Sequence, residues 1–120
     1  MITVRFVRDS QRNITGLFMN GHAGYAEEGQ DIVCAGASTL LYTLVNSLER
    51  VCGLDSEKTT RIVEGEDVCA EVILPDGCFA DEAQKLRAQV VMETIYSGFI
   101  SLAMSANTDG NKYINVTEDF

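Results

Sequence analysis

The spacing of apolar residues changes along this chain of 120 residues, and that change limits the folds it can adopt. Apolar and polar residues alternate over residues 2–6, which is the period-two pattern of a half-buried strand. Leu41, Leu44 and Leu48 recur instead at the spacing of an amphipathic helix. The chain therefore has to combine strands and helices around one core.

The complete pattern predicts two β-hairpins, each followed by a helix, and then one last strand. In chain order we expect strands over 2–6 and 14–19, a helix from about 35 to 52, strands over 60–63 and 68–74, a helix from 79 onward, and a strand over 113–116. Such an order fits a mostly antiparallel sheet with both helices packed on one face. We predict an α+β fold of order ββα-ββα-β, formed by residues 1–120 as a single domain.

The same spacing predicts which side of each helix is buried. On the first helix the expected buried residues are Leu41, Leu44, Leu48 and Val51, and Gly53 is the expected stop. On the second helix they are Ala83, Leu86, Val90, Ile95, Phe99 and Leu102.

Composition narrows the class of protein. No uninterrupted apolar run approaches the about 18 residues of a membrane span, and the N-terminus lacks the apolar stretch of a signal peptide. We therefore expect a cytoplasmic protein without a membrane partner. In a reducing compartment the four cysteines stay unpaired, and their spacing lacks the pairs of a zinc site, so no metal or cofactor is expected. Cys52, Cys69 and Cys78 are interpreted as ordinary core thiols.

The charge balance also restricts the partners. Nine basic residues stand against 18 acidic ones, a formal net charge of −9. A uniformly acidic surface repels a phosphate backbone, so direct binding of nucleic acid is not expected. The charge favours a basic partner, although acidity also serves solubility alone.

Residues 21–38 hold more glycine and mixed polarity than the fold requires. His22 stands at the end of the second strand, and Cys34 lies twelve positions later, where the first helix is expected to begin. A helix N-terminus presents unpaired N–H groups and a partial positive charge, which favour a thiolate. The backbone N–H groups of Cys34, Ala35 and Gly36 could also hold an oxyanion. This arrangement predicts a nucleophilic cysteine.

A histidine beside that cysteine would complete the chemistry. The imidazole of His22 exchanges protons near neutral pH, so it could stabilise the thiolate, protonate a leaving amine and activate water. Asp31 could orient the imidazole, but capping the helix or lying on the surface is the simpler role. Ser38 lies one turn after Cys34 and could hydrogen-bond to the thiol region, to the substrate or to its own helix.

The segment between the two residues is expected to be a mobile substrate loop. It contains Gly21, Gly24 and Gly29, and Tyr25 offers an aromatic surface to a substrate side chain or packs as an ordinary half-exposed residue.

The motif as a whole resembles a known family. Gly-His-Ala-Gly-Tyr-Ala at 21–26 and Gly-x-Asp-Ile-Val-Cys-Ala-x-x-Ser at 29–38 resemble the ribosomal-processing cysteine protease family (Prp), and the length and element order of the whole chain are similar. The resemblance implies a homodimeric α/β sandwich in which Cys34 is the nucleophile and His22 its partner. The family pattern also contains Gly21, Asp31 and Ser38.

The resemblance further implies a substrate. Members of this bacterial family remove a short N-terminal extension, after an aromatic residue, from a basic large-subunit ribosomal protein, number twenty-seven of the L series. One departure concerns the helix: the family commonly reads Cys-Ala-Ala-Val-Ser where this chain has Gly36 and Ala37. Both differences leave the reacting groups in place.

Two other classes of function remain open from the residues. A ribosome-assembly factor could capture the peptide without cutting it, although capture alone requires neither His22 nor Cys34. A redox or metal sensor could use several thiols, although the scattered cysteines do not favour it.

Overall fold

The computed structural model describes residues 1–22, 28–63, 67–108, 110 and 112–120, apart from the side chains of residues 22, 28–31, 67 and 68. Five strands and two long helices follow the predicted order, with one short helix added. The elements are β1 (Ile2–Arg8), β2 (Ile14–His22), α1 (Glu28–Arg50), α2 (Ser56–Thr59), β3 (Thr60–Val63), β4 (Asp67–Ile73), α3 (Glu82–Ala106) and β5 (Ile114–Asp119).

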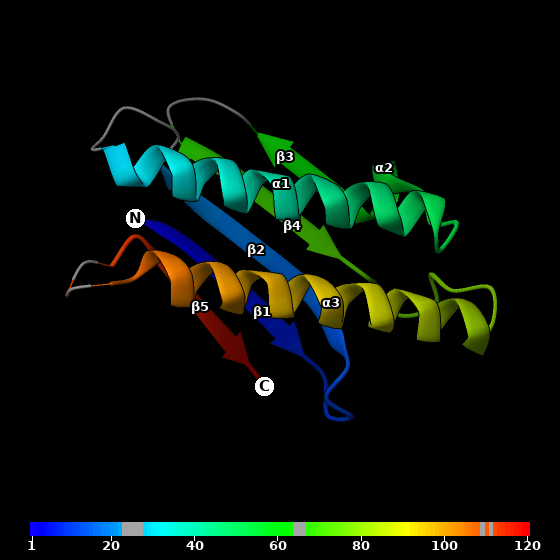
Figure 1. The fold of residues 1–120 in the computed structure, drawn as a ribbon. Helices are drawn as coiled ribbons and strands as arrows, with labels where there is room; N and C mark the ends of the chain where they lie inside the picture. The colour runs from blue at the N-terminus through cyan, green and yellow to red at the C-terminus, as the bar shows by residue number, and fades with distance from the viewer. Residues whose placement is uncertain (23–27, 64–66, 109, 111) are drawn as a thin grey trace.

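The strands form one sheet in the spatial order β3-β4-β2-β1-β5. Antiparallel pairing joins β1 to β2, β2 to β4 and β3 to β4, whereas β5 lies parallel to β1. Both long helices cover the same face of the sheet (Figure 1). The predicted α+β class, with a mostly antiparallel sheet and two helices on one face, is confirmed.

The core lies between the sheet and the two long helices. Alternate residues of the central strands point into it, among them Val4, Phe6 and Leu17, none of which has any exposed surface. Phe6 meets the rings of Tyr96 and Phe99 edge to face, with centroids 5.0 and 5.9 Å apart. These aromatic contacts attach α3 to the centre of the sheet.

Helix α1 begins seven residues earlier than expected, at Glu28 instead of about residue 35. Val33 and Ala37 are buried and extend the stripe of Leu41, Leu44 and Leu48 toward the N-terminus. The stripe is expected to start later from the sequence alone, because a valine and an alanine give a weaker periodic signal than three leucines.

The end of α1 agrees with the predicted stop. Gly53 has a φ of 71°, its N–H donates to the carbonyl of Glu49 at 3.0 Å, and the N–H of Leu54 donates to the carbonyl of Leu48 at 2.9 Å. The bond from Gly53 to the carbonyl four residues earlier is that of the αL cap, which requires a left-handed residue after the helix and so favours glycine. Val51 was expected in the core but is 56% exposed, because it lies beyond the last helical turn.

In its first half, helix α3 buries a different side from the side that the spacing predicts. Leu86 and Val90 are 66% and 59% exposed, and Ala83 is exposed as well. The buried stripe consists of Ala88, Met92, Ile95 and Phe99. Since α3 carries apolar residues on more than one side, spacing alone could not identify the side that faces the sheet.

Side-chain amides of α3 connect it to the rest of the fold. Gln89 accepts a hydrogen bond from the N–H of Ile14 at 2.7 Å and donates to its carbonyl at 2.8 Å. Asn107, the C-cap of α3, donates to the carbonyl of Ile114 at 2.8 Å and accepts from the N–H of Tyr113 at 2.8 Å. These amides fix the starts of β2 and β5 against the helix.

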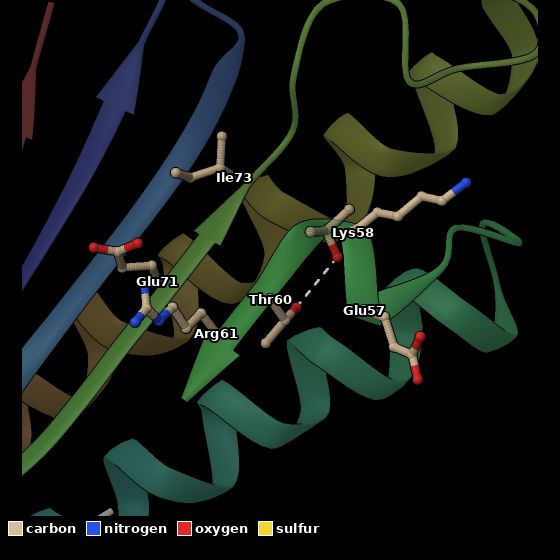
Figure 2. Close-up of a pocket in the computed structure, with 7 residues that line it drawn as sticks. Glu57, Lys58, Thr60, Arg61, Glu71 and Ile73 are labelled. Atoms are coloured by element: carbon tan, nitrogen blue, oxygen red, sulfur yellow. Dashed lines mark hydrogen bonds between the residues drawn. The ribbon is translucent and has the colours of Figure 1, made fainter. Parts of the chain in front are cut away.

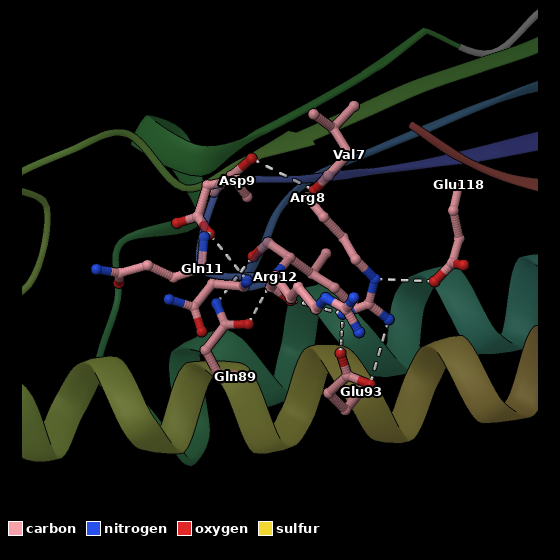
Figure 3. Close-up of polar contacts among 11 residues, drawn as sticks. Val7, Arg8, Asp9, Gln11, Arg12, Gln89, Glu93 and Glu118 are labelled. Carbon is pink, nitrogen blue, oxygen red and sulfur yellow. Dashed lines mark hydrogen bonds and ion pairs between the residues drawn. The ribbon is translucent and has the colours of Figure 1, made fainter. Parts of the chain in front are cut away.

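A second polar connection centres on Arg8 at the end of β1 (Figure 3). Its guanidinium bonds both carboxylate oxygens of Glu93 on α3 and donates to Glu118 on β5 at 2.8 Å. It also lies 5.3 Å from the ring centroid of Tyr96. The hydrogen bond to Glu93 is the main cause that raises the pKa of Arg8 above its ordinary value. Arg8 therefore joins three elements in one charged cluster.

One finding differs from the expectation about membranes. Residues 32–50 of α1 are long and apolar enough to cross a membrane, by length and composition alone. In this fold Leu41, Leu44 and Leu48 of the same segment are fully buried against the sheet. The core helix of a soluble protein can be equally long and apolar, so the composition of this segment does not decide whether it spans a membrane.

Candidate functional site

Several chain segments meet at one end of the molecule, at the left of Figure 1. The last residues of β2, the first turns of α1 and the C-terminal end of α3 lie there together. His22 is the final residue of β2, and Cys34 lies in the second turn of α1. The fold thus brings the two predicted catalytic residues to the same end of the domain.

Cys34 occupies one flank of α1. It is half-buried and packs against the core, as does Val45, and Ser38 on the same flank is half-buried too. Ser38 follows Cys34 by four positions and Val45 follows Ser38 by seven, so the three residues lie along one side of the helix. Val45 was missed by the sequence analysis, although helical spacing from Cys34 would have found it.

The predicted position of Cys34 at the helix N-terminus is wrong, because α1 starts six residues earlier, at Glu28. The field of a helix end weakens within the first turn, so it acts less on a residue in the second turn. An N–H group inside a helix donates to the carbonyl four residues earlier. This conformation therefore removes the basis on which the N–H groups of Cys34, Ala35 and Gly36 were expected to bind an oxyanion.

The backbone before His22 requires a glycine. A Cβ at Gly21 would lie 2.7 Å from Ile2 Cα and 2.9 Å from the carbonyl oxygen of Met1. Both are backbone atoms, which cannot move aside as a side-chain end can. Gly21 therefore lets β2 pass close to the start of β1 just before His22, whose backbone is in register with Asp67 of β4.

The remaining predicted site residues fall in different places. Gly21 belongs to β2 and Gly29 to α1, so neither is part of a loop as expected. Gly24 and Tyr25 lie outside the described residues. The side chains of His22 and Asp31 also lie outside the described part, so their contact with Cys34 stays a prediction.

The other three cysteines differ in their surroundings. Cys52 is buried and Cys78 half-buried, and burial is the main cause that raises the pKa of each thiol. Cys69 is exposed, so the prediction that it is a core thiol is wrong. On β4 it alternates with Ala70 and Val72, which point to the helices, so Cys69 faces away from the core.

A hollow of about 190 Å³ lies at the β3 edge of the sheet (Figure 2). Its lining comes from α2, β3 and β4, whereas Cys34 belongs to α1. The described lining consists of Glu57, Lys58, Thr59, Thr60, Arg61, Glu71 and Ile73. These side chains include neither a thiol nor an imidazole, so this hollow does not offer the nucleophilic chemistry expected of Cys34.

Solved structures share this fold. Across 99% of this chain and 94% of the other, the chain superposes on SMU.848 from Streptococcus mutans with a TM-score of 0.79 and 25% identity. A TM-score of 0.74, at 24% identity, relates it to an essential ribosomal processing protease Prp from S. aureus in complex with a substrate peptide, over 99% of this chain and 100% of that one.

Curated relatives match about half of the chain. The ribosomal processing cysteine protease Prp of Staphylococcus aureus (strain Mu50) is 45% identical over 58 residues, which are 48% of this chain and 52% of the relative. The protein of the same name from Bacillus subtilis (strain 168) is 36% identical over 55 residues, 46% of this chain and 49% of the relative. The matched stretch thus spans only about half the length of these relatives.

A helix-borne cysteine and a strand-end histidine thus lie at the same end of an α+β sandwich. The family follows from a match over most of the sequence. Residues 1–111 match the family model described as Cysteine protease Prp, and the chain belongs to this family.

Proposed function

We propose that this protein is a cysteine endopeptidase in which Cys34 is the nucleophile and His22 the general acid and base. The family match over residues 1–111 carries the proposal. The placement of Cys34 on α1 and of His22 at the end of β2, at the same end of the molecule, supports it (Figure 1). One S. aureus relative at 27% identity was solved with a covalently linked product peptide, as expected for covalent catalysis in that protein.

The reaction follows from the two residue types. The Cys34 thiolate attacks the carbonyl carbon of the scissile bond, and the tetrahedral intermediate collapses as the C–N bond breaks. His22 gives its proton to the leaving amine, and a thioester remains on Cys34. Water then attacks the thioester while His22 accepts one of its protons, which releases the acid product and restores the thiolate.

The substrate we propose is the N-terminal extension of a basic large-subunit ribosomal protein, number twenty-seven of the L series, cut after an aromatic residue. The net charge of −9 supports it, because an acidic enzyme attracts a basic protein over long range. We further propose that the enzyme is cytoplasmic and a homodimer. Light scattering on the purified protein would measure its mass in solution.

A cleavage assay with intact-mass analysis tests the proposal. The ribosomal protein with its extension is incubated with the wild type and with Cys34→Ala, His22→Ala and Cys69→Ala variants. Cys69→Ala is the matched control, since it removes an exposed thiol on β4 and leaves the candidate site untouched. We expect one cut by the wild type and by Cys69→Ala, none by Cys34→Ala, and a small residual rate for His22→Ala.

The other results have definite meanings. Turnover by Cys34→Ala would end its assignment as the nucleophile, and a normal rate for His22→Ala would remove this residue from the mechanism. Binding of the extension without any cut by the wild type would favour a peptide-capturing assembly factor instead.

A further inference from the structure

Helices α1 and α3 touch through two reciprocal glycine–leucine contacts. They run antiparallel (Figure 1), and each carries a glycine and a leucine four residues apart. A Cβ at Gly36 would lie 3.0 Å from Leu102 Cδ1 and 3.5 Å from its Cδ2. A Cβ at Gly98 would lie 2.6 Å from Leu40 Cδ2. Each leucine therefore occupies the space that a side chain on the opposite glycine would take.

The first contact lies directly behind Cys34. Gly36 is two residues after Cys34, and two residues correspond to about 200° of rotation around a helix. Leu102 therefore presses on the side of α1 nearly opposite to the thiol. Val33 and Ala37 hold the same turn against the sheet, with 3% and 0% exposed surface. The position of this turn over the sheet and its distance from α3 are thus set by separate contacts.

We propose that Leu102, acting through Gly36, is a positioning residue for the Cys34 nucleophile. This inference rests on the proposed function of Cys34. Glycine is an unfavourable helix residue, so its presence at position 36 has a structural reason in the closeness of Leu102. Close-packed interiors transmit such displacements, so a change of volume at this contact moves the turn that carries Cys34 along the line from Leu102 to the thiol.

The two residues form a matched pair, and this predicts how variants behave. With Leu102 retained, a methyl group at position 36 requires the neighbours to shift by a few tenths of an ångström. Small displacements of reacting groups lower the rate of the chemical step, so Gly36→Ala is expected to reduce kcat about threefold to tenfold with little change of KM. Leu102→Val in the same chain makes room for the methyl group and is expected to restore kcat.

The second contact provides a control within the same pair of helices. Gly98→Ala meets Leu40 at an even shorter distance, but Leu40 is six residues after Cys34, more than one helical turn further from it than Gly36. A general loosening of the helix pair would affect both sites. Gly98→Ala is therefore expected to change Tm at least as much as Gly36→Ala and to leave kcat within about twofold of the wild type.

The experiment measures kcat, KM and Tm for Gly36→Ala, Leu102→Val, the double variant, and Gly98→Ala. It also measures the pH dependence of iodoacetamide labelling of Cys34, located by peptide mass mapping. We expect a lower kcat and a changed labelling profile in Gly36→Ala, with both restored in the double variant. Equal losses of kcat in Gly36→Ala and Gly98→Ala, unchanged values in Gly36→Ala, or no restoration by Leu102→Val would overturn the proposal.

Two safeguards keep the test decisive. If Gly36→Ala does not fold, the single Leu102→Val variant, which opens space behind the same turn, takes its place and must also alter kcat and labelling. If the wild type cuts no peptide, the proposed function fails, whereas the labelling profiles still report whether position 36 controls the environment of the Cys34 thiol.

Discussion

The clearest prediction about stability concerns the side-chain amide of Gln89. It accepts a bond from the N–H of Ile14 at 2.7 Å and donates one to the carbonyl of the same residue at 2.8 Å. Ile14 starts β2 and has no exposed surface, and Gln89 points from α3 to this hairpin (Figure 3). One side chain thus satisfies both backbone groups of a buried residue.

Gln89→Met removes both bonds and nearly preserves the shape of the side chain. Each partly buried backbone group left without its partner costs about 1–3 kcal/mol. For these two part-buried groups together we expect a loss of about 3 kcal/mol in the free energy of unfolding. At about 4 °C per kcal/mol for a domain of this size, Tm falls by about 12 °C. The loss is large beside the about 5–15 kcal/mol that stabilises an ordinary domain.

Gln89→Glu distinguishes the contributions of the two hydrogen bonds to stability, because the new carboxyl group changes its charge with pH. An ionised carboxylate accepts from the N–H of Ile14 but repels its carbonyl, whereas a neutral carboxyl can also donate. The folded state therefore prefers the protonated form of the new carboxyl. Stability gained in this way is present at low pH and disappears as the pH rises, so the deficit relative to the wild type should be smaller near about pH 4 than near about pH 7.

Urea unfolding at both pH values measures these differences. Gln11→Met is the matched control, because this glutamine lies exposed in the turn of the same hairpin. We expect Gln11→Met to remain within about 0.5 kcal/mol of the wild type. A similarly small effect of Gln89→Met, or a deficit of Gln89→Glu that does not change with pH, would refute the reasoning.

Three further predictions follow from other contacts. Gly21→Ala should lower Tm and peptidase activity more than Gly16→Ala does, as measured by thermal melts and activity assays. The new methyl group at position 21 meets backbone atoms, whereas the nearest neighbour at position 16 is the movable ring of Phe18. Arg8→Lys should lower the free energy of unfolding, measured in urea, by about 1–2 kcal/mol, since an ammonium group cannot replace the forked hydrogen bonds of the guanidinium. Iodoacetamide at about pH 8 should label the exposed Cys69 before the buried Cys52, because the raised pKa of Cys52 leaves less of it as thiolate. Labelling of Cys52 should increase as the pH rises. Equal initial labelling rates of the two cysteines, measured by mass mapping, would contradict this prediction.

Local patterns in the sequence were sufficient for the element order. Alternation over residues 2–6, helical spacing from Leu41 to Leu48 and the stop at Gly53 all arise from interactions within a few positions of the chain. The same patterns placed the start of α1 seven residues late, since Val33 and Ala37 become recognisable as core only when the sheet beneath them is known. They also could not select the buried side of α3, which is apolar on more than one side.

The candidate site divides in the same way. Residue type and the motif around positions 21–38 predict His22 and Cys34 as the reacting pair, and this pairing stays a prediction. Tertiary structure decided that Cys69 is exposed, that Cys34 lies in the second turn of α1, and that Leu102 packs behind it. Spacing along a chain reports neighbours within an element, whereas contacts such as Gly36 with Leu102 join residues far apart in sequence. They arise only when the elements pack together, so the sequence determined the chemistry available and the packing determined where it is held.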